Sequence, residues 1–459
     1  MVFSVRRGAG PPKARVGVVV AVAVSVSLAG LAGCSGGNPS ATPSGAGADS
    51  SAVDASATDA VAVDRPPVAD GVVRHVPKDF PSVQLAVDGS SPGDVVLIDR
   101  GTYAESVVVR VNDITIRGVD RNAVIFDGND EKENGITVTA DGVAVENLTV
   151  RRFAFNGLLF TKAYDDDVDA KQHTVLRGYR ASYVTANNNG AYGIYAFFAR
   201  GGMIDHTYTS GHPDSGIYVG QCKPCDAVVT DNVSERNAIG YSGTNASGNL
   251  FIINSVWRRN RIGMTPNSQD QERLAPQGDV VLAGNLVSEN QDPGAPATPK
   301  GAAGFGIAVN GGERNQVVKN RVVGNVVAGI ALTDINAYEP SGNVVTDNVL
   351  ERNGTDLLFA STASVPALEA AANCFAGNTF LTSSPDAIET TLPCDKRVTG
   401  MIATRPIQLQ NPSPDVDYRT IPVPSPQPTM PDAATTGRTR VSRATPSVDL
   451  ATITVPPAP

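Results

Sequence analysis

The sequence predicts an all-β protein, a parallel β-helix solenoid with a short N-terminal capping helix. Two repeated motifs and a series of short apolar segments support this prediction. The first motif is a glycine followed by alternating residues, and its spacings are 23, 24, 23, 43 and 23 residues. The glycines are Gly193, Gly216, Gly240, Gly263, Gly306 and Gly329. We attribute the spacing of 43 to one inserted loop, residues 291–305, which is rich in Pro, Gly and Ala.

The second motif is a pair of asparagines five residues apart, which precedes the glycine. Its members are Asn232/Asn237, Asn285/Asn290, Asn320/Asn325 and Asn348/Asn353. A unit of about 23 residues that contains only short strands and bends has no room for a helix. Stacking such units places identical positions about 4.8 Å apart, so that the asparagines can hydrogen-bond along the coil. The repeated asparagines are therefore expected to be structural.

The N-terminus has the features of an export signal. Basic residues precede an apolar run at 16–28, which is too short to span a bilayer, and Leu31-Ala-Gly-Cys34 follows. The quartet looks like the lipobox of bacterial lipoproteins, which implies cleavage before Cys34 and fatty acylation, such as palmitate, at that residue. We therefore expect a signal peptide at 1–33 and a protein anchored by lipid on the outer face of the cell membrane.

Composition divides the rest of the chain into three parts. Residues 34–70 are rich in Ser, Ala, Gly and Asp and are expected to form a disordered tether. The solenoid is expected at 71–394, and the apolar spacing of Phe80-Pro-Ser-Val-Gln-Leu-Ala-Val-Asp-Gly89 predicts the helix that caps its open end. The Pro/Thr-rich tail, residues 395–459, is expected to lie partly extended on the solenoid and to be mostly disordered.

The charges and cysteines restrict the partners and the compartment. A net charge of −9 argues against nucleic acid, and the membrane is expected to be contacted only through the lipid. With Cys34 acylated, the other four cysteines form two local pairs, which predicts disulfides in an oxidising compartment. The expected pairs are Cys222 with Cys225 and Cys374 with Cys394.

Several N-terminal segments resemble a known superfamily. Residues 80–87, Pro92-Gly-Asp-Val-Val-Leu97, Gly101-Thr-Tyr-Ala-Glu-Ser106 and Ile114-Thr-Ile-Arg-Gly118 look like the opening of pectin-lyase-like right-handed β-helix proteins. That group includes pectate lyases, pectin methylesterases, alginate epimerases and a copper-accessory protein. Two further stretches, 189–195 and 214–221, look like bacterial parallel β-helix repeat proteins of unassigned activity. The resemblance covers residues 76 to 385 and implies the right-handed fold much more specifically than any function.

The candidate binding residues are two tyrosines at equivalent repeat positions. The residue after the repeat glycine is apolar and should point inward, so Tyr195 and Tyr218 should point outward on adjacent coils. Stacked outward tyrosines suit a sugar ring, and the alternative is an aromatic stack that only stabilises the sheet.

The candidate catalytic residues are His212 and Asp214. They fall in an apparent two-residue insertion and should be exposed, so that they could act as acid and base on a uronate. The alternative is a polar turn without catalytic function. Aligned on the glycine, His206 falls on the position of Asn232, and Asp205 falls on that of Asp231, which makes both structural.

Two groups of residues could each bind a metal ion, and the alternative for each group is a structural role without a metal. Asp165, Asp167 and Asp169 form an acidic turn that could hold Ca²⁺, or that is simply solvated. The two histidines at 206 and 212, together with Cys222 and Cys225, would supply four zinc or copper ligands unless the cysteines are oxidised.

Together these features predict a cell-surface protein that binds or scaffolds a polysaccharide or another cell-envelope glycan. The alternatives are a polysaccharide lyase, epimerase or hydrolase that acts on a uronate-type glycan, and a protein that handles copper or another metal. Whether the chain is an enzyme is left open by the sequence.

Overall fold

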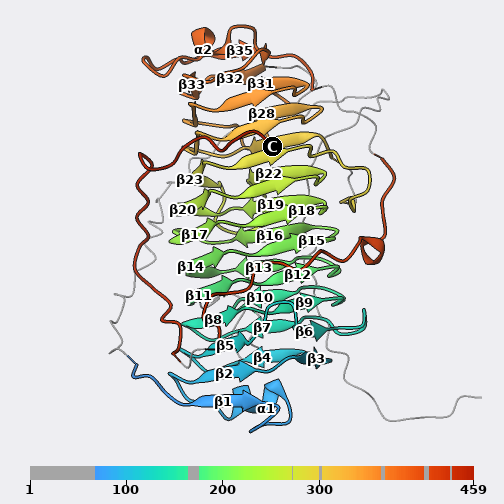
Figure 1. Ribbon diagram of the computed structural model, residues 1–459. Coiled ribbons are helices and arrows are strands. Elements are labelled where there is room, and N and C mark those ends of the chain that lie inside the picture. The colour runs from blue at the N-terminus through green and yellow to red at the C-terminus, as the bar shows by residue number, and fades with distance from the viewer. Residues whose placement is uncertain are drawn as a thin grey trace, which may run out of the picture.

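The chain folds into an elongated solenoid (Figure 1). The computed structural model describes residues 68–163, 175–270, 272–298, 302–362, 367–407, 413–434 and 437–459. Strands of three parallel sheets follow one another in every coil, so the chain advances by one strand spacing per turn. This confirms the fold class that the sequence predicts.

The three sheets are named A, B and C here, and within the described residues they have 12, 10 and 11 strands. Sheet A contains β1 (Val73–Val76), β2 (Val95–Ile98), β5 (Thr115–Gly118), β8 (Val143–Glu146), β11 (Leu176–Ser182), β14 (Ala199–Asp205), β17 (Ala227–Thr230), β20 (Ser247–Ile253), β23 (Gly278–Ala283), β26 (Gln316–Val318), β29 (Val344–Thr346) and β33 (Cys374–Ala376). Sheet B contains β3 (Gly101–Tyr103), β6 (Val124–Asp127), β9 (Thr149–Arg151), β12 (Thr185–Asn187), β15 (Tyr208–Ser210), β18 (Val233–Glu235), β21 (Val256–Arg258), β24 (Leu286–Ser288), β27 (Arg321–Val323) and β30 (Val349–Glu351). Sheet C contains β4 (Val107–Val109), β7 (Ile136–Val138), β10 (Leu158–Phe160), β13 (Ile194–Phe197), β16 (Ser215–Gly220), β19 (Ile239–Thr244), β22 (Ile262–Asn267), β25 (Phe305–Asn310), β28 (Ala328–Thr333), β31 (Thr355–Ala360) and β34 (Ser383–Ser384).

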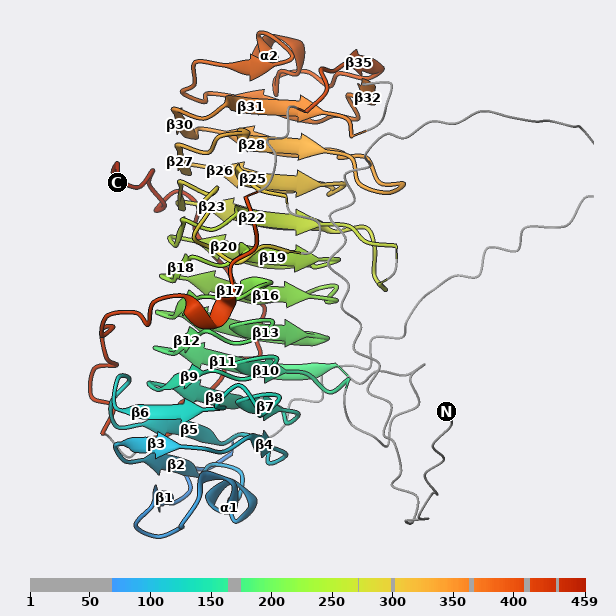
Figure 2. The ribbon, with the colours of Figure 1, turned by 90° about the vertical axis from the view of Figure 1, so that its right-hand side faces the viewer.

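Both ends of the solenoid carry small additional elements. Helix α1 (Val83–Asp88) starts at Ser82, whose side chain accepts a hydrogen bond from the Leu85 amide, and buries Val83, Ala86 and Val87. It covers the first coil (Figure 2), as the sequence predicts. At the other end lie α2 (Ile388–Thr391) and the antiparallel pair β32 (Ala367–Glu369) and β35 (Met401–Ala403), and the tail contains a 3-10 turn, η1 (Tyr418–Thr420).

The register of sheet C confirms the inward and outward assignment of the repeat. The residue that follows each repeat glycine lies in one fully buried column. The column contains Ile194, Ile217, Tyr241, Met264, Ile307, Ile330 and Leu357. The repeat glycines are required because a Cβ on Gly240 would lie 2.5 Å from the carbonyl oxygen of Gly263.

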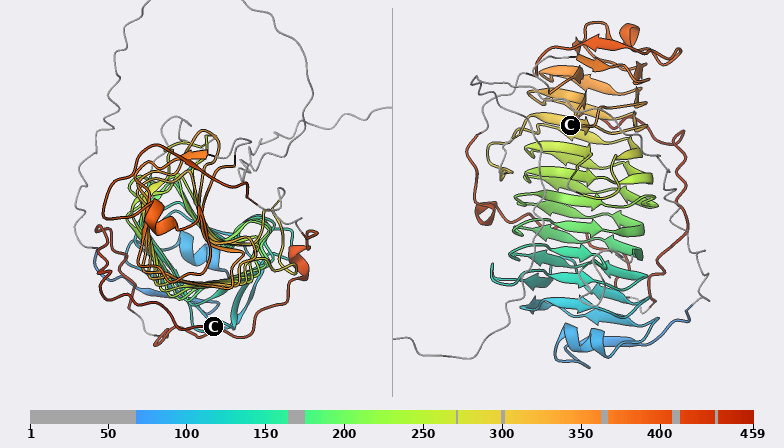
Figure 3. Two further views of the ribbon diagram at one scale, coloured as in Figure 1. Left: turned by 90° about the horizontal axis from the view of Figure 1, so that it is seen from above. Right: turned by 180° about the vertical axis from the view of Figure 1, so that it is seen from behind.

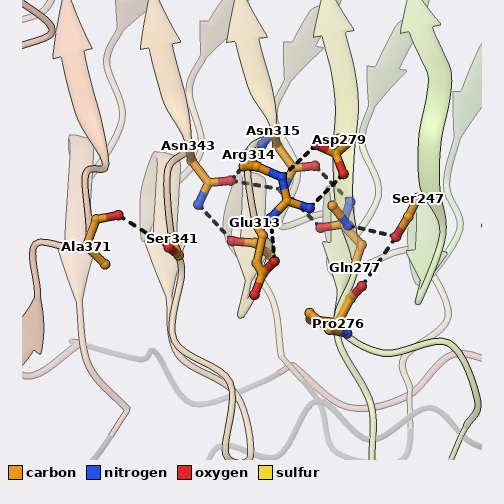
Figure 4. A network of polar contacts seen from close by, with 12 residues as sticks. Ser247, Pro276, Gln277, Asp279, Glu313, Arg314, Asn315, Ser341, Asn343 and Ala371 are labelled. Atoms are coloured by element: carbon orange, nitrogen blue, oxygen red, sulfur yellow. Dashed lines mark hydrogen bonds and ion pairs between the residues drawn. The ribbon is translucent and has the colours of Figure 1, made fainter. Parts of the chain in front are cut away.

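The asparagines form hydrogen-bonded ladders inside the bends. In one ladder the side chain of Asn320 donates to Asn348 Oδ1 at 3.0 Å, and Asn348 donates to Asn378 Oδ1 at 2.9 Å. The second ladder contains Asn189, His212, Asn237, Asn260, Asn290, Asn325 and Asn353. A third ladder includes Gln277, Asn315 and Asn343 (Figure 4). Each ladder satisfies buried backbone groups at the bends, which confirms that the repeated asparagines are structural.

One alignment of the sequence prediction is wrong by one residue. The position equivalent to Asn232 is occupied by Thr207, whose amide and hydroxyl both donate to Asn232 Oδ1. Asp205 pairs with Thr230 in the sheet, and His206 lies at the bend with a positive φ of 55°. His206 is therefore outside the ladder.

The C-terminal tail lies along the outside of the solenoid for most of its described length, although the sequence suggested that most of it is disordered. Seen from above, it runs around the outer surface of the sheets (Figure 3). It contacts coils far apart in the sequence: Asn188 Nδ2 donates to the Tyr418 carbonyl, Met430 donates to Asn147, and Arg443 pairs with Asp113. These contacts depend on side chains of the solenoid, not on strand pairing, and therefore produce no periodic pattern in the tail.

The last part of the tail covers an apolar patch on the outer face of sheet A. Ile453 is 5% exposed and packs with Val228, Ile253 and Val281. We expect Ile453→Ala to lower the free energy of unfolding, or of tail detachment, by about 2 kcal/mol, because three buried carbon atoms of the isoleucine side chain are removed. Hydrogen exchange of the tail amides measures this effect. The matched control is Val423→Ala, because Val423 is 67% exposed, and an equal loss in both variants would contradict the packing.

Candidate functional site

An aromatic strip lies on the outward face of sheet C, on β13, β16 and the turn before β13. It consists of Tyr192, Tyr195, Phe197 and Tyr218. Tyr195 pairs with Tyr218 in the sheet register, and their ring centroids are 4.8 Å apart. The Tyr192 ring stacks on Tyr195 with centroids 4.4 Å apart. The predicted tyrosine pair is thus part of a larger aromatic surface.

The rings of the strip differ in their exposure to solvent. Tyr192, Tyr195 and Phe197 are half-buried, whereas Tyr218 is 2% exposed. A ligand would accordingly meet Tyr195 and its two half-buried neighbours first. The buried Tyr218 ring supports them from the next coil.

Two carboxyl groups adjoin the strip. Asp214 precedes β16, accepts a hydrogen bond from the Ser215 hydroxyl at 2.7 Å, and is hydrogen-bonded to the Tyr192 side chain. Glu272 lies on the loop between β22 and β23, and the Tyr218 hydroxyl lies 3.5 Å from its Oε2. Gln221 Nε2 also donates to Glu272 Oε2. Tyr192 contacts Asp214 and Tyr218 contacts Glu272, and the centroids of these two rings lie 5.3 Å apart, which brings the two carboxyl groups to the same part of the strip.

The loop that carries Glu272 is attached to the solenoid on both sides. Asn245 Nδ2 donates to the carbonyls of Gln269 and Arg273, at 2.9 Å and 3.0 Å. At the far end, the Gln277 amide donates to Ser268 Oγ at 3.0 Å, and the Gln277 side chain joins the third ladder (Figure 4). These contacts hold Glu272 over sheet C.

Burial changes the protonation of this site. Desolvation, with a smaller contribution from the charge of Glu272, raises the pKa of Asp214 to about 7, against the hydrogen bonds of Ser215 and Tyr192 that lower it. Desolvation also raises the pKa of Glu272. The pKa of Tyr218 rises well above its usual value, because the ring is buried and Glu272 is nearby. Near neutral pH the site therefore retains a carboxyl proton that an exposed aspartate would have lost.

The prediction that His212 is an exposed acid or base is wrong. His212 is 0% exposed and occupies the ladder position between Asn189 and Asn237. Its Nδ1 lies 2.7 Å from Asn237 Oδ1, and its Nε2 lies 3.1 Å from the Asn189 side-chain amide. Burial lowers the pKa of His212 to about 4, so the ring is neutral and structural. Of the predicted pair His212 and Asp214, only Asp214 lies at the site.

The four solenoid cysteines form the two predicted disulfides, Cys222–Cys225 and Cys374–Cys394. Oxidation removes the two thiolates that a site with His206 and His212 would need, and His212 is already bonded to two asparagines. Among the described residues, no group of three or more His, Cys, Asp or Glu side chains could hold a metal ion. The acidic turn with Asp165, Asp167 and Asp169 lies outside the described residues, and so does Cys34. In the described ranges, no helix is both long and apolar enough to cross a membrane.

The fold and this surface define a right-handed parallel β-helix protein with an aromatic and carboxyl site. A family profile described as "Right handed beta helix region" matches residues 176–345. The A-module of a mannuronan C-5 epimerase from Azotobacter vinelandii is similar at 15% identity and a TM-score of 0.46, over 68% of this chain and 92% of that chain. An alginate lyase from Paenibacillus sp. is similar at 13% identity and a TM-score of 0.40, over 60% and 95% of the two chains. A pectate lyase is similar at 14% identity and a TM-score of 0.37, over 67% and 73%. No curated protein matches the sequence.

Proposed function

We propose that the chain is an exported, lipid-anchored protein that binds a polysaccharide on the aromatic strip of sheet C. The observation that carries the proposal is the cluster of Tyr192, Tyr195 and Tyr218, with ring centroids 4.4 to 5.3 Å apart, beside the carboxyl groups of Asp214 and Glu272. Aromatic rings pack against the apolar faces of sugars, and hydroxyl and carboxyl groups bond to their hydroxyls. The strip extends across two adjacent coils on the outward face of sheet C.

We expect Tyr195→Ala to weaken polysaccharide binding about 10-fold, equivalent to about 1.4 kcal/mol, because the half-buried ring that contacts the three other rings of the strip is lost. Affinity electrophoresis in gels that contain xylan, mannan, β-glucan, pectate or alginate measures the retardation of the full chain. The matched control is Tyr183→Ala, because Tyr183 is half-buried and stacks on His206, with centroids 4.6 Å apart, away from the strip. Equal retardation of the two variants would contradict the assignment, and so would a wild-type chain that none of the gels retards.

The anchor is a second part of the proposal. The basic, apolar and small-residue segments before Cys34 support acylation of this cysteine, and the two disulfides fit an oxidising compartment. Cys34→Ala should move the protein from the membrane fraction to the soluble fraction, and wild type should carry a thioether-linked diacylglycerol mass at the mature N-terminus. Membrane retention of the variant would contradict acylation at Cys34.

The lyase or epimerase alternative has lost its candidate base, because His212 is enclosed by the ladder. Asp214 and Glu272 offer another kind of chemistry at the same surface. Catalysis at this surface would therefore involve these two carboxyl groups.

A further inference from the structure

We propose that Asp214 and Glu272 form an acid and base pair that hydrolyses a glycosidic bond of a neutral polysaccharide. This inference rests on the proposed binding of a polysaccharide to the aromatic strip. It goes further by assigning a reaction, two reacting groups and a class of glycan.

The two carboxyl groups converge from distant segments of the chain. Asp214 lies at the start of β16, and Glu272 reaches the same site from the loop after β22. Tyr192 is hydrogen-bonded to Asp214, and the Tyr218 hydroxyl faces Glu272 at 3.5 Å. Because these tyrosines belong to the strip, a sugar ring seated on it has both carboxyl groups at its edge. Two carboxyl groups beside a glycosidic bond are the usual equipment for its hydrolysis.

A buried polar atom without a hydrogen-bond partner lies beside the pair. Gln221 is 1% exposed, and its Nε2 donates to Glu272, yet its Oε1 has no hydrogen-bond partner. Buried amide oxygens are nearly always satisfied, so this unpaired oxygen still has the capacity to accept a hydrogen bond from a ligand. A sugar hydroxyl is a suitable donor for this oxygen.

The groups around the two carboxyls indicate the charge of the substrate. In the described part of the chain, the groups that act on the two carboxyls are Ser215, Tyr192, Tyr218, Gln221 and the carboxyls themselves. None of these groups is a cation, and the nearby His212 ring is held neutral by burial. With Asp214 protonated, a uronate would add a second negative charge beside the Glu272 carboxylate at this buried site, without a neutralising partner. A neutral glycan avoids that cost.

The reaction balances with water as the only co-reactant. The protonated Asp214 carboxyl gives its proton to the glycosidic oxygen as the bond from this oxygen to the anomeric carbon breaks. The Glu272 carboxylate accepts a proton from water, whose oxygen forms the new bond to the anomeric carbon. The products are two shorter glycans, one with a new reducing end. Burial of Asp214 raises its pKa to about 7, which keeps the required proton available near neutrality.

The test uses the full chain with xylan, mannan and β-glucan in H₂¹⁸O. We expect release of reducing ends and one ¹⁸O atom at each new reducing end. We expect Asp214→Asn and Glu272→Gln each to lower the rate about 100-fold or more, with binding retained. The matched controls are Asp231→Asn and Glu289→Gln, because both carboxyl groups are exposed and lie at bends beside sheet B, away from sheet C, and both should keep the wild-type rate.

Three outcomes would overturn the inference. The first is binding of a neutral glycan without release of reducing ends. The second is hydrolysis that survives both substitutions. The third is the formation of unsaturated products from pectate or alginate, which absorb at about 235 nm and indicate β-elimination. Each of these leaves polysaccharide binding intact. Failure to bind any of the polysaccharides would overturn the proposed function as well. The wild-type ¹⁸O experiment decides the reaction even if a variant fails to fold.

Discussion

His212→Asn is expected to protect the protein against acid without changing polysaccharide binding. In the folded protein the pKa of His212 is lowered from 6.5 to about 4, so the unfolded chain binds the proton first as the pH falls. The wild type therefore loses stability as the pH falls from about 6.5 to about 4, by about 3 kcal/mol. Asparagine restores the usual ladder residue and does not titrate. The loss over this interval should disappear in the variant.

The cause of this pH dependence is the hydrogen-bond network around the ring. Asn237 Oδ1 is an acceptor, which assigns the ring proton to Nδ1, and Nε2 accepts from the Asn189 amide. A second proton on Nε2 would face the hydrogen atoms of that amide. Urea unfolding at pH 7.5, 6, 5 and 4 measures the effect. Equal acid sensitivity of wild type and variant would contradict the buried, neutral assignment.

Asn290→Ala is expected to destabilise the solenoid by about 3 to 5 kcal/mol, one of the largest effects of any single substitution here. The amide and side chain of Asn260 both donate to Asn290 Oδ1 at 3.1 Å. Asn290 Nδ2 donates in turn to the Trp257 carbonyl and to Asn325 Oδ1. Alanine leaves these buried groups without a partner, and the site is closed to water.

Chemical unfolding of the variant measures this loss. The control is Asn122→Ala, because the Asn122 side chain is exposed and bonds only to Gln427 of the tail. It should cost less than about 1 kcal/mol. Similar losses in both variants would show that the ladder contributes little beyond an ordinary surface hydrogen bond.

The fold was predictable because the coil repeats the same steric requirement. Four of the six repeat glycines, Gly193, Gly240, Gly263 and Gly306, lie against the carbonyl of the next one, and the ladder asparagines bond to one another from coil to coil, so both residue types recur at equivalent positions. The position of Tyr195 and Tyr218 followed from the same register. These features depend on local geometry that every coil shares.

The error at His212 has a definite origin. Thr207 occupies a ladder position through its hydroxyl. Because threonine does not resemble the asparagines at this position in other coils, the sequence pattern assigns the position to His206 instead. With Thr207 in place, His212 follows it by five residues, as Asn237 follows Asn232. The extra residue lies after His212, next to Asp214, and not before it.

Glu272 was missed because its position depends on a loop, not on the repeat. The spacing of 43 residues was attributed to one insertion at 291–305, but ten residues also separate β22 (Ile262–Asn267) from β23 (Gly278–Ala283). The corresponding gap between β19 and β20 is two residues. The return of this loop to Tyr218, 54 residues earlier, is a tertiary contact without a periodic signal.

The central claim is that polysaccharide binds to the aromatic strip and its two carboxyl groups. Hydrogen exchange of the full chain, with and without a saturating amount of the polysaccharide that it retains most strongly, tests this claim directly. We predict slower exchange in β13, in β16 and in the loop 268–277, with no change in the tail around η1. Protection confined to another surface would contradict the claim, for example to the hollow of about 880 Å³ that Phe380, Leu381 and Ile407 help to line.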